Sequence, residues 1–309
     1  MTSEGIGWWG IPLAIIAGTL RGSIPFLFVS LGECLTEKSG KINLGLEGTL
    51  LMGAMSAYAI SYLTNSPWLG VIVAGIAGMA LGGIHGWLIQ QPRVNDIAVG
   101  IAMIIFGSGL AFFLGKPFIQ PVAPRLPVIA FGNWIPISQV QSALQVSPLF
   151  LLGVIIAPLM QWFFRTTRWG LLVRAVGDSP ESAQALGISI LKVRMLSIVA
   201  GSFLAGIGGA CLSLYYPGSW SEGLSSGQGL MAVALVIFAR WNPHQCLYAS
   251  LLFGGAQAIG PALQSVGIEG YYYLFNASPY ILTLLIMIIT CSPKRKLRGS
   301  PGALGQLKG

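Results

Sequence analysis

Charged residues are scarce in this sequence. Only 8% of its 309 residues are Asp, Glu, Lys or Arg, whereas 54% are hydrophobic. A soluble domain carries about 25% charged residues, so a soluble globular protein is excluded. Disorder is excluded as well, because disordered chains combine low hydrophobicity with high net charge. Together with a mean hydropathy of +0.74, this composition indicates a polytopic membrane protein.

The chain also lacks the residue patterns of metal sites, disulfide frameworks and ATP hydrolysis. Its cysteines are scattered, without a Cys-X-X-Cys pair, at Cys34, Cys211, Cys246 and Cys291. This spacing is untypical of a metal site or a disulfide framework. Gly-Lys occurs at 40–41 and 115–116, but the Ser or Thr that completes a P-loop does not follow. We therefore expect no metal, no cofactor and no ATP hydrolysis by this chain.

A hydrolase motif occurs once. Residues 223–227 match the pattern Gly-X-Ser-X-Gly, and His85 is a candidate general base. The nucleophile elbow requires a strand-to-helix turn in an α/β sheet, and this sequence predicts no such sheet. A hydrolase is therefore not expected.

Nine apolar stretches predict the membrane-spanning part of the chain. A straight transmembrane helix needs about 20 apolar residues, and the stretches cover residues 9–33, 47–64, 67–89, 95–115, 147–165, 194–216, 228–240, 246–264 and 277–291. Arg21 interrupts the first stretch, so either it faces the bundle interior or the residues before it lie in the membrane interface. The sequence predicts one all-α domain, residues 1–309, with eight or nine transmembrane helices.

Basic residues predict the orientation of these helices. Both the loop 166–194 and the tail 292–309 are rich in Lys and Arg, and the positive-inside rule places such segments in the cytoplasm. The long loop 116–147 and the N-terminus then lie outside. The 17 Lys and Arg residues against 9 Asp and Glu thus reflect topology, and no nucleic-acid partner is expected.

Two pairs of segments predict an internal repeat. Residues 74–81 resemble residues 205–212, and residues 102–107 resemble residues 234–239. The offsets are nearly equal, and the predicted topology gives the paired helices opposite directions. This is the pattern of an inverted repeat, as in many transporters. The alternative is a chance similarity between glycine-rich apolar helices.

The cytoplasmic loop contains a short helix with both ends marked. Ser179 is a suitable N-cap, Pro180 fits the first helical position, and Glu181 favours the positive end of the helix. Gly187 fits the left-handed residue that ends a helix. The small residues that would let a partner approach closely are Ser182, Ala183 and Ala185. Because so short a helix is not stable alone, we expect it to dock on a partner; a capped turn without function is the alternative.

Polar residues at breaks in the apolar stretches are candidates for a translocation path. They are Asn43, Glu47, Asn95 and Asp96. Polar groups in a membrane find partners or line a cavity, which makes them functional candidates. The structural alternative is that Asn43 and Glu47 satisfy a broken helix and that Asp96 caps one. The structural alternative is favoured, because irregular backbone needs partners whatever the ligand.

Four motifs, in order, resemble a transporter family. Residues 170–188, GLLVRAVGDSPESAQALGI, are similar to the coupling loop of bacterial ABC-importer permeases, in the branch with ribose, branched-chain amino acid and nucleoside permeases. Residues 41–48, KINLGLEG, resemble the signature of the nucleoside and simple-sugar members, and residues 94–100 and 236–243 fit the same branch. The branch usually has Gly at the position of Ala239 and an acidic residue within 38–40. The resemblance extends from about residue 18 to residue 291.

This resemblance implies a permease subunit in the inner membrane of a bacterium. It implies alternating access for a small polar solute, a nucleoside or simple sugar, driven by a separate ABC ATPase that docks on the short helix. The further partners implied are a second permease in a heterodimer, an extracytoplasmic solute-binding protein and membrane lipid. An ion-coupled secondary transporter or channel is the alternative. It would need ionisable residues deep in its spans, and the chain offers few beyond Arg21, Glu47 and Asp96.

Overall fold

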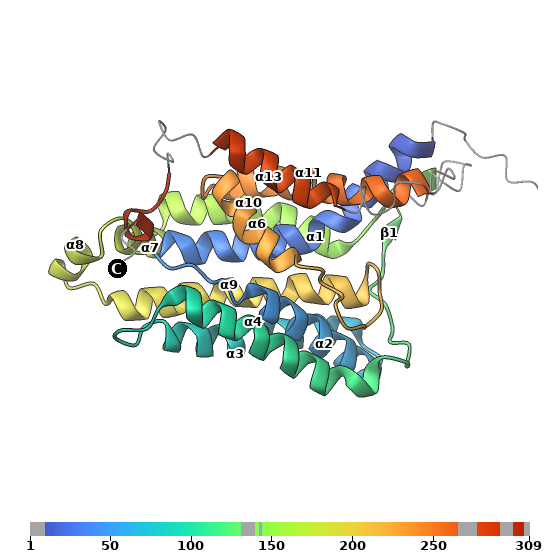
Figure 1. Cartoon of the computed structure of the whole chain (residues 1–309), viewed down its shortest axis with the longest axis horizontal. Coiled ribbons are helices and arrows are strands. Elements are labelled where there is room, and N and C mark those ends of the chain that lie inside the picture. The colour runs from blue at the N-terminus through green and yellow to red at the C-terminus, as the bar shows by residue number, and fades with distance from the viewer. Residues whose placement is uncertain (1–9, 131–139, 142–143, 265–276, 291–298, 306–309) are drawn as a thin grey trace, which may run out of the picture.

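The fold is a bundle of long helices that lie along one common direction (Figure 1). The computed structural model describes residues 10–130, 140–141, 144–264, 277–290 and 299–305. Its α-helices are α1 (Gly10–Lys38), α2 (Leu46–Thr64), α3 (Pro67–Leu88), α4 (Asp96–Gly115), α6 (Pro148–Thr166), α7 (Arg168–Asp178), α8 (Pro180–Ala185), α9 (Ile190–Leu214), α10 (Gln228–Phe238), α11 (Pro243–Gln264) and α13 (Ser278–Thr290). Two 3₁₀ turns, η2 (Lys116–Phe118) and η3 (Gly302–Gly305), and a pair of two-residue antiparallel strands, β1 (Ile129–Ala130) and β2 (Gln145–Val146), complete it.

Each of the nine predicted apolar stretches contains a helix. The largest differences are at α1, which continues five residues beyond the predicted end at 33, and at α9, which begins four residues before 194. Within the described residues, six helices are long and apolar enough to cross a membrane: α1, α3, α4, α6, α9 and α11. The total of eight or nine spans remains a prediction. Cys291 and the basic residues 294–298 lie outside the described residues.

Arg21 lies in the middle of an unbroken α1. Its side chain is half-buried and within hydrogen-bonding reach of the Tyr215 hydroxyl, just beyond the end of α9. Of the two alternatives for this residue, the structure therefore favours the one in which Arg21 faces the bundle interior, where a polar partner reduces the cost of a charge in the membrane.

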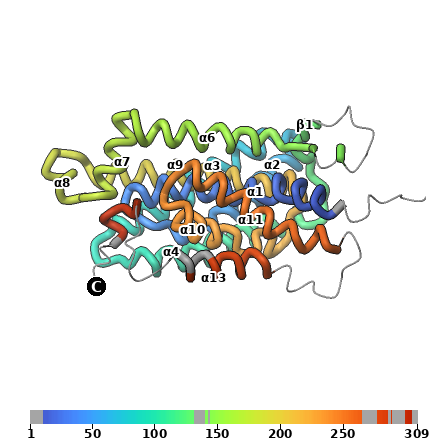
Figure 2. The backbone as a smooth tube through the Cα atoms, turned by 90° about the horizontal axis from the view of Figure 1, so that it is seen from above, coloured from blue at the N-terminus to red at the C-terminus, as the bar shows by residue number. Residues whose placement is uncertain are grey.

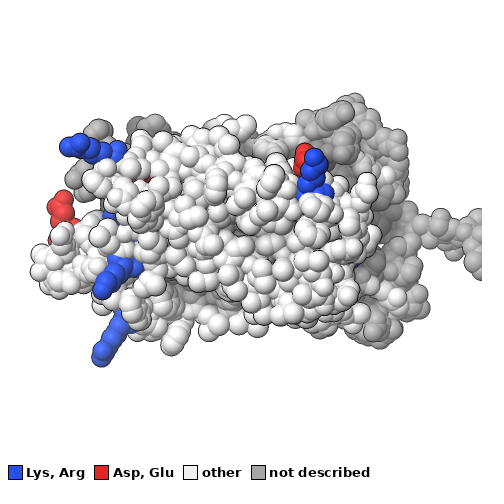
Figure 3. Space-filling view, turned by 90° about the horizontal axis from the view of Figure 1, so that it is seen from below, with Lys and Arg blue, Asp and Glu red and all other residues white. Residues whose placement is uncertain are grey.

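Basic side chains are concentrated near one end of the described bundle. α7, α8 and η3 lie at one end, and β1 lies at the other (Figure 1). On the face seen in Figure 3, most Lys and Arg side chains gather at the α8 end, which we call the basic end. This distribution agrees with the predicted cytoplasmic position of the loop 166–194.

The centre of the bundle is α9, which packs against α1, α2 and α3. α6 and α13 lie along opposite sides of the bundle (Figure 2). The central helices approach closely at glycines: a Cβ on Gly32 of α1 would overlap the carbonyl oxygen of Gly201 in α9, and one on Gly53 of α2 would lie 2.5 Å from the carbonyl oxygen of Gly206. Small residues are the usual means of such packing in membranes, where lipid is as apolar as the helices.

Substituting Gly32 by Ala is expected to destabilise the bundle, because the added methyl group must displace the backbone of α9. Overpacking of this kind costs about 1–3 kcal/mol. The measurement is the melting temperature of the detergent-purified protein. Gly83→Ala in α3 is the matched control, since no other group lies within 4 Å of a Cβ at that position and the gain in helix propensity is the same. Equal melting temperatures for the two variants would contradict the close contact of α1 with α9.

Candidate functional site

The predicted short helix of the cytoplasmic loop is α8. Ser179 is its N-cap, with Oγ accepting a hydrogen bond from Ser182 N at 3.4 Å, and Pro180 occupies the first turn. Gly187 has φ of +78°, the left-handed conformation that favours glycine. The turn that follows is closed by Gly187 N, which donates to Gln184 O at 2.9 Å, and by Ile188 N, which donates to Ala183 O at 3.1 Å. The residues expected to begin and end this helix therefore do so.

The side chains of α8 divide into an outer and an inner set. The outer set is exposed and consists of Glu181, Ser182, Gln184, Ala185 and Leu186. Leu186 is 79% exposed, whereas Ala183 is only 2% exposed. Ala183 packs in the apolar cluster that contains Val176 of α7 and Val193 of α9. The expectation that Ala183 faces a partner is therefore wrong: this residue attaches α8 to its own chain.

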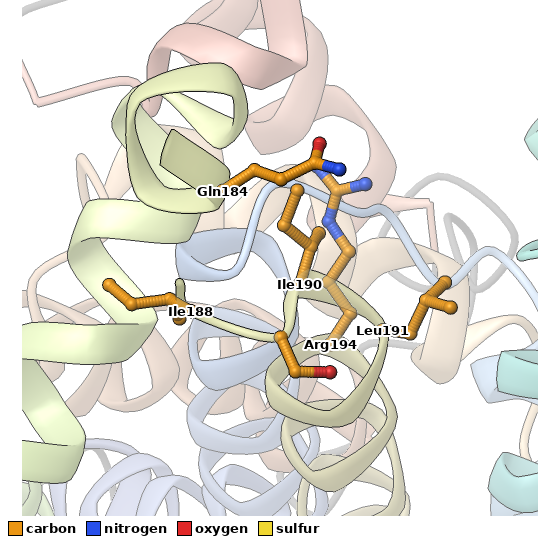
Figure 4. A pocket seen from close by; sticks show the side chains of 6 residues that line it. Gln184, Ile188, Ile190, Leu191 and Arg194 are labelled. Atoms are coloured by element: carbon orange, nitrogen blue, oxygen red, sulfur yellow. The ribbon is translucent and has the colours of Figure 1, made fainter. Parts of the chain in front are cut away.

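A hollow of about 390 Å³ lies next to α8 at the basic end (Figure 4). Gln184 contributes from α8, and the other lining residues come from the turn after α8 and the start of α9: Ile188, Ser189, Ile190, Leu191 and Arg194. Arg194 Nε donates a hydrogen bond to the carbonyl oxygen of Ser39 at 3.2 Å. The hollow is therefore adjacent to the chain segment that follows α1.

An ion pair joins that same segment to α4. Lys41 Nζ lies 2.9 and 2.7 Å from the two carboxylate oxygens of Asp96. The N-cap of α4 is Asn95, whose Oδ1 accepts from Ile97 N at 2.9 Å and from Ala98 N at 3.2 Å. The expectation that Asp96 caps this helix is therefore wrong. The capping residue is Asn95, and Asp96 forms an ion pair with Lys41.

Glu47 lies where two helices begin inside the bundle. The segment 39–45 runs inward from the end of α1, so that α2 and α10 both start away from the ends of the bundle (Figure 1). The Glu47 carboxylate accepts hydrogen bonds from Gly227 N at 3.0 Å, from Gly229 N at 2.7 Å and from the Ser225 hydroxyl. This carboxylate satisfies the first N–H groups of α10, and a negative charge is favoured at that end of a helix. Ser225, the serine of the Gly-X-Ser-X-Gly motif, thus donates its hydroxyl hydrogen bond to Glu47 and has a structural role.

Asn43 differs from the other three candidates because it has an unused acceptor in the interior. Its Nδ2 lies 3.3 Å from Ser202 Oγ, but its buried Oδ1 has no hydrogen-bond partner among the described residues. The His85 ring, which is 1% exposed, lies close by. A Cβ on Gly45 would lie 3.2 Å from Asn43 Oδ1 and 3.5 Å from His85 Nδ1, so the two atoms flank the same glycine.

Two buried carboxylates at the end of α1 were missed by the sequence analysis. Glu33 Oε1 accepts from the backbone N of Asn43 at 2.8 Å, and Glu37 accepts from Trp241 Nε1. Both side chains are almost completely buried. The signal is the i, i+4 spacing of two acids, of which Glu33 is the last residue of the predicted stretch 9–33 and Glu37 lies one helical turn beyond it. The four candidates for the translocation path lie in two places and do not form one site. Asn95 and Asp96 lie at the basic end, and Asn43 and Glu47 lie in the interior.

With six helices long and apolar enough to cross a membrane among the described residues, the fold is that of a multi-pass membrane protein. The chain belongs to the family described as branched-chain amino acid transport system / permease component, whose profile matches residues 14–291. It is 31% identical over 259 residues to the putative glucose ABC transporter permease protein TsgC13 of Haloferax volcanii, covering 82% of this chain and 79% of the relative. It is 28% identical over 291 residues to the nucleoside ABC transporter permease protein NupC of Lactococcus lactis, covering 89% and 91%. It is 28% identical over 289 residues to the guanosine ABC transporter permease protein NupQ of Bacillus subtilis, covering 88% and 90%.

The chain is thus an ABC importer permease subunit of the cytoplasmic membrane. It is a transport component rather than an enzyme, and ATP hydrolysis lies in a partner ATPase. The predicted protein class, the all-α multi-pass fold and the family are confirmed, whereas the number of spans, the single domain and the inverted repeat remain predictions. The roles of individual site residues remain predictions.

Glu47→Ala is expected to lower the melting temperature of the purified protein, because the N–H groups of Gly227 and Gly229 lose their acceptor. A buried donor left unsatisfied costs about 1–3 kcal/mol. Glu222→Ala serves as the control, since Glu222 is exposed in the loop before α10. If Glu47→Ala and Glu222→Ala both have the melting temperature of the wild type, the Glu47 carboxylate does not hold the start of α10.

Proposed function

We propose that this permease carries a neutral polar solute, a nucleoside or a simple sugar, inward by alternating access. The names of three relatives support this substrate class, because they specify glucose, nucleosides and guanosine. Among the path candidates in the interior, the one acidic group, the Glu47 carboxylate, is engaged by Ser225, Gly227 and Gly229 of its own chain and is not available to pair with an ionic solute. An ionic solute would require compensating charge in a low-dielectric path.

The observation that carries the transport mechanism, in which a separate ATPase drives alternating access, is α8. It is a capped and protruding helix at the basic end. A helix of two turns or fewer is not stable alone, and α8 is attached to the bundle only by its inner side, including Ala183. Its outer side remains free for the ATPase. In this proposal the residues from Ser179 to Gly187 convert closure of the ATPase into movement of α7 and α9.

Among the four path candidates, we assign substrate contact to Asn43 alone. The buried Oδ1 of Asn43 has no partner in the described chain, and a solute hydroxyl or amine could donate to it. Glu47, Asn95 and Asp96 keep structural roles, because each is engaged by hydrogen bonds or an ion pair within the chain.

The proposed complex also contains a second, different permease and an extracytoplasmic solute-binding protein. Two relatives from the same Lactococcus lactis strain, NupC and NupB, are both called nucleoside ABC transporter permease proteins. NupB is 27% identical to this chain over 167 residues. A pair of such subunits would enclose the path between them, with membrane lipid around the pair.

The substrate class is tested by uptake into cells or vesicles that contain the complete transporter, against labelled nucleosides, sugars and amino acids. Uptake of a nucleoside or sugar, with no competition from leucine, is expected. Competition by leucine without any effect of nucleosides or sugars would overturn the substrate class while leaving the family assignment intact.

The coupling role is tested by Gly187→Val, with Gly187→Asn as the matched control. No other group lies within 4 Å of a Cβ at Gly187, so within this chain the substitution acts through the backbone alone. A β-branched residue in the left-handed region costs on the order of 1–2 kcal/mol, whereas Asn tolerates this conformation. We expect Gly187→Val to lose substrate uptake at normal expression and Gly187→Asn to keep it. Wild-type uptake by Gly187→Val would exclude a coupling role for the end of α8.

A further inference from the structure

We propose that the hollow beside α8 receives an acidic side chain of the ATPase subunit and that Arg194 binds its carboxylate. This inference rests on the proposed coupling function of α8. The hollow joins α8, through Gln184, to the start of α9, through Arg194. In Figure 4 both side chains extend over the same side of the hollow. A carboxylate that enters would therefore meet a guanidinium and an amide from two different helices.

Arg194 is a half-buried cation that forms no ion pair with a carboxylate of the described residues. Its Nε donates to the carbonyl oxygen of Ser39, and no described carboxylate forms an ion pair with it. The nearby carboxylate of Asp96 is already bound by Lys41. A guanidinium carries five N–H donors in a fork that matches a carboxylate. Donors therefore remain for a bidentate partner, which gives the stronger type of charge-assisted hydrogen bond.

The walls of the hollow suit a carboxylate on a protein partner. Three apolar side chains, Ile188, Ile190 and Leu191, line it together with the polar groups. Apolar walls exclude water from a bound ion pair, which strengthens the attraction between the charges. Leu191 is 60% exposed and Leu186, just after α8, is 79% exposed. Exposed apolar side chains therefore occur both at the end of α8 and in the lining of the hollow, so a protein docked on α8 would cover both.

Charge also favours an acidic partner at this end. Between residues 165 and 194 the sequence holds five basic residues and two acidic ones, and most of the Lys and Arg side chains visible in Figure 3 gather at the basic end. Complementary potentials steer association and fix the register of an interface. The ion pair would have a mechanical consequence, because Arg194 also holds the carbonyl oxygen of Ser39. The docked carboxylate would then be linked through one side chain to the segment between α1 and α2.

The first test measures binding of the ATPase subunit of the native complex to permease complexes in nanodiscs of phosphatidylcholine. Arg194→Gln is compared with Lys192→Gln, which removes the same charge two residues away, where the side chain is exposed and does not line the hollow. We expect Arg194→Gln to weaken binding by roughly tenfold, the effect of removing one member of a partly desolvated pair. Lys192→Gln should change binding by less than about twofold. Equal affinities for both variants would overturn the proposal.

The second test does not depend on the folding of an arginine variant. Ser189 lines the hollow, and its side chain makes no capping hydrogen bond at the start of α9, so Ser189→Cys is a mild change. In a background cleared of the native cysteines, a maleimide should label this cysteine, and the ATPase subunit should protect it. Protection by phosphatidylglycerol without the ATPase would identify a lipid site and overturn the proposal, as would the absence of any protection.

The two proposals fail in different ways. If the ATPase subunit does not bind the wild-type permease, the coupling function itself is wrong. If it binds the wild type and Arg194→Gln equally well, only the assignment of the hollow is wrong.

Discussion

The structure depends on one interaction that closes the bundle interior, the contact of the Glu47 carboxylate with the start of α10. In a bilayer, a backbone N–H without an acceptor costs several kcal/mol, and no water is present to replace the missing partner. A helix that begins inside the bundle is therefore tolerated only if its first N–H groups are satisfied. Glu47 provides that acceptor from the start of α2. The two helices that begin inside the bundle, α2 and α10, therefore stabilise each other.

The glycines around this contact follow from the same requirement. A Cβ on Gly229 would lie 2.6 Å from the Cα of Glu47, so the carboxylate reaches the helix end only because no side chain is present there. Tyr280 of α13 supports the loop before α10, since its hydroxyl donates to the carbonyl oxygen of Ser226 at 2.7 Å. The Glu47 contact, the lack of a side chain at Gly229 and the hydrogen bond from Tyr280 of α13 thus together hold the start of α10.

Local features were predictable from the sequence, and distant contacts were not. The ends of α8 follow from Ser179, Pro180 and Gly187, because capping depends on neighbouring residues. The partners of Glu47 are about 180 residues away, and no local pattern identifies them. Glu33 and Glu37 are not predicted from the sequence, because acids are costly inside a membrane and only tertiary partners such as Asn43 and Trp241 allow them there. Ala183 was misassigned because a small residue suits both a partner and the protein's own core.

The glycine contacts of α9 restrict how this bundle can change shape. Where backbone meets backbone, as at Gly32 and Gly201, no side-chain rotamers are available through which the interface could adjust by small steps. Packed interiors resist continuous deformation. The helices α1, α2, α3 and α9 therefore form a stiff central body. A shear between them would require whole helices to separate, whereas α6 and α13, which lie along the sides of the bundle (Figure 2), can tilt against this body without opening its centre.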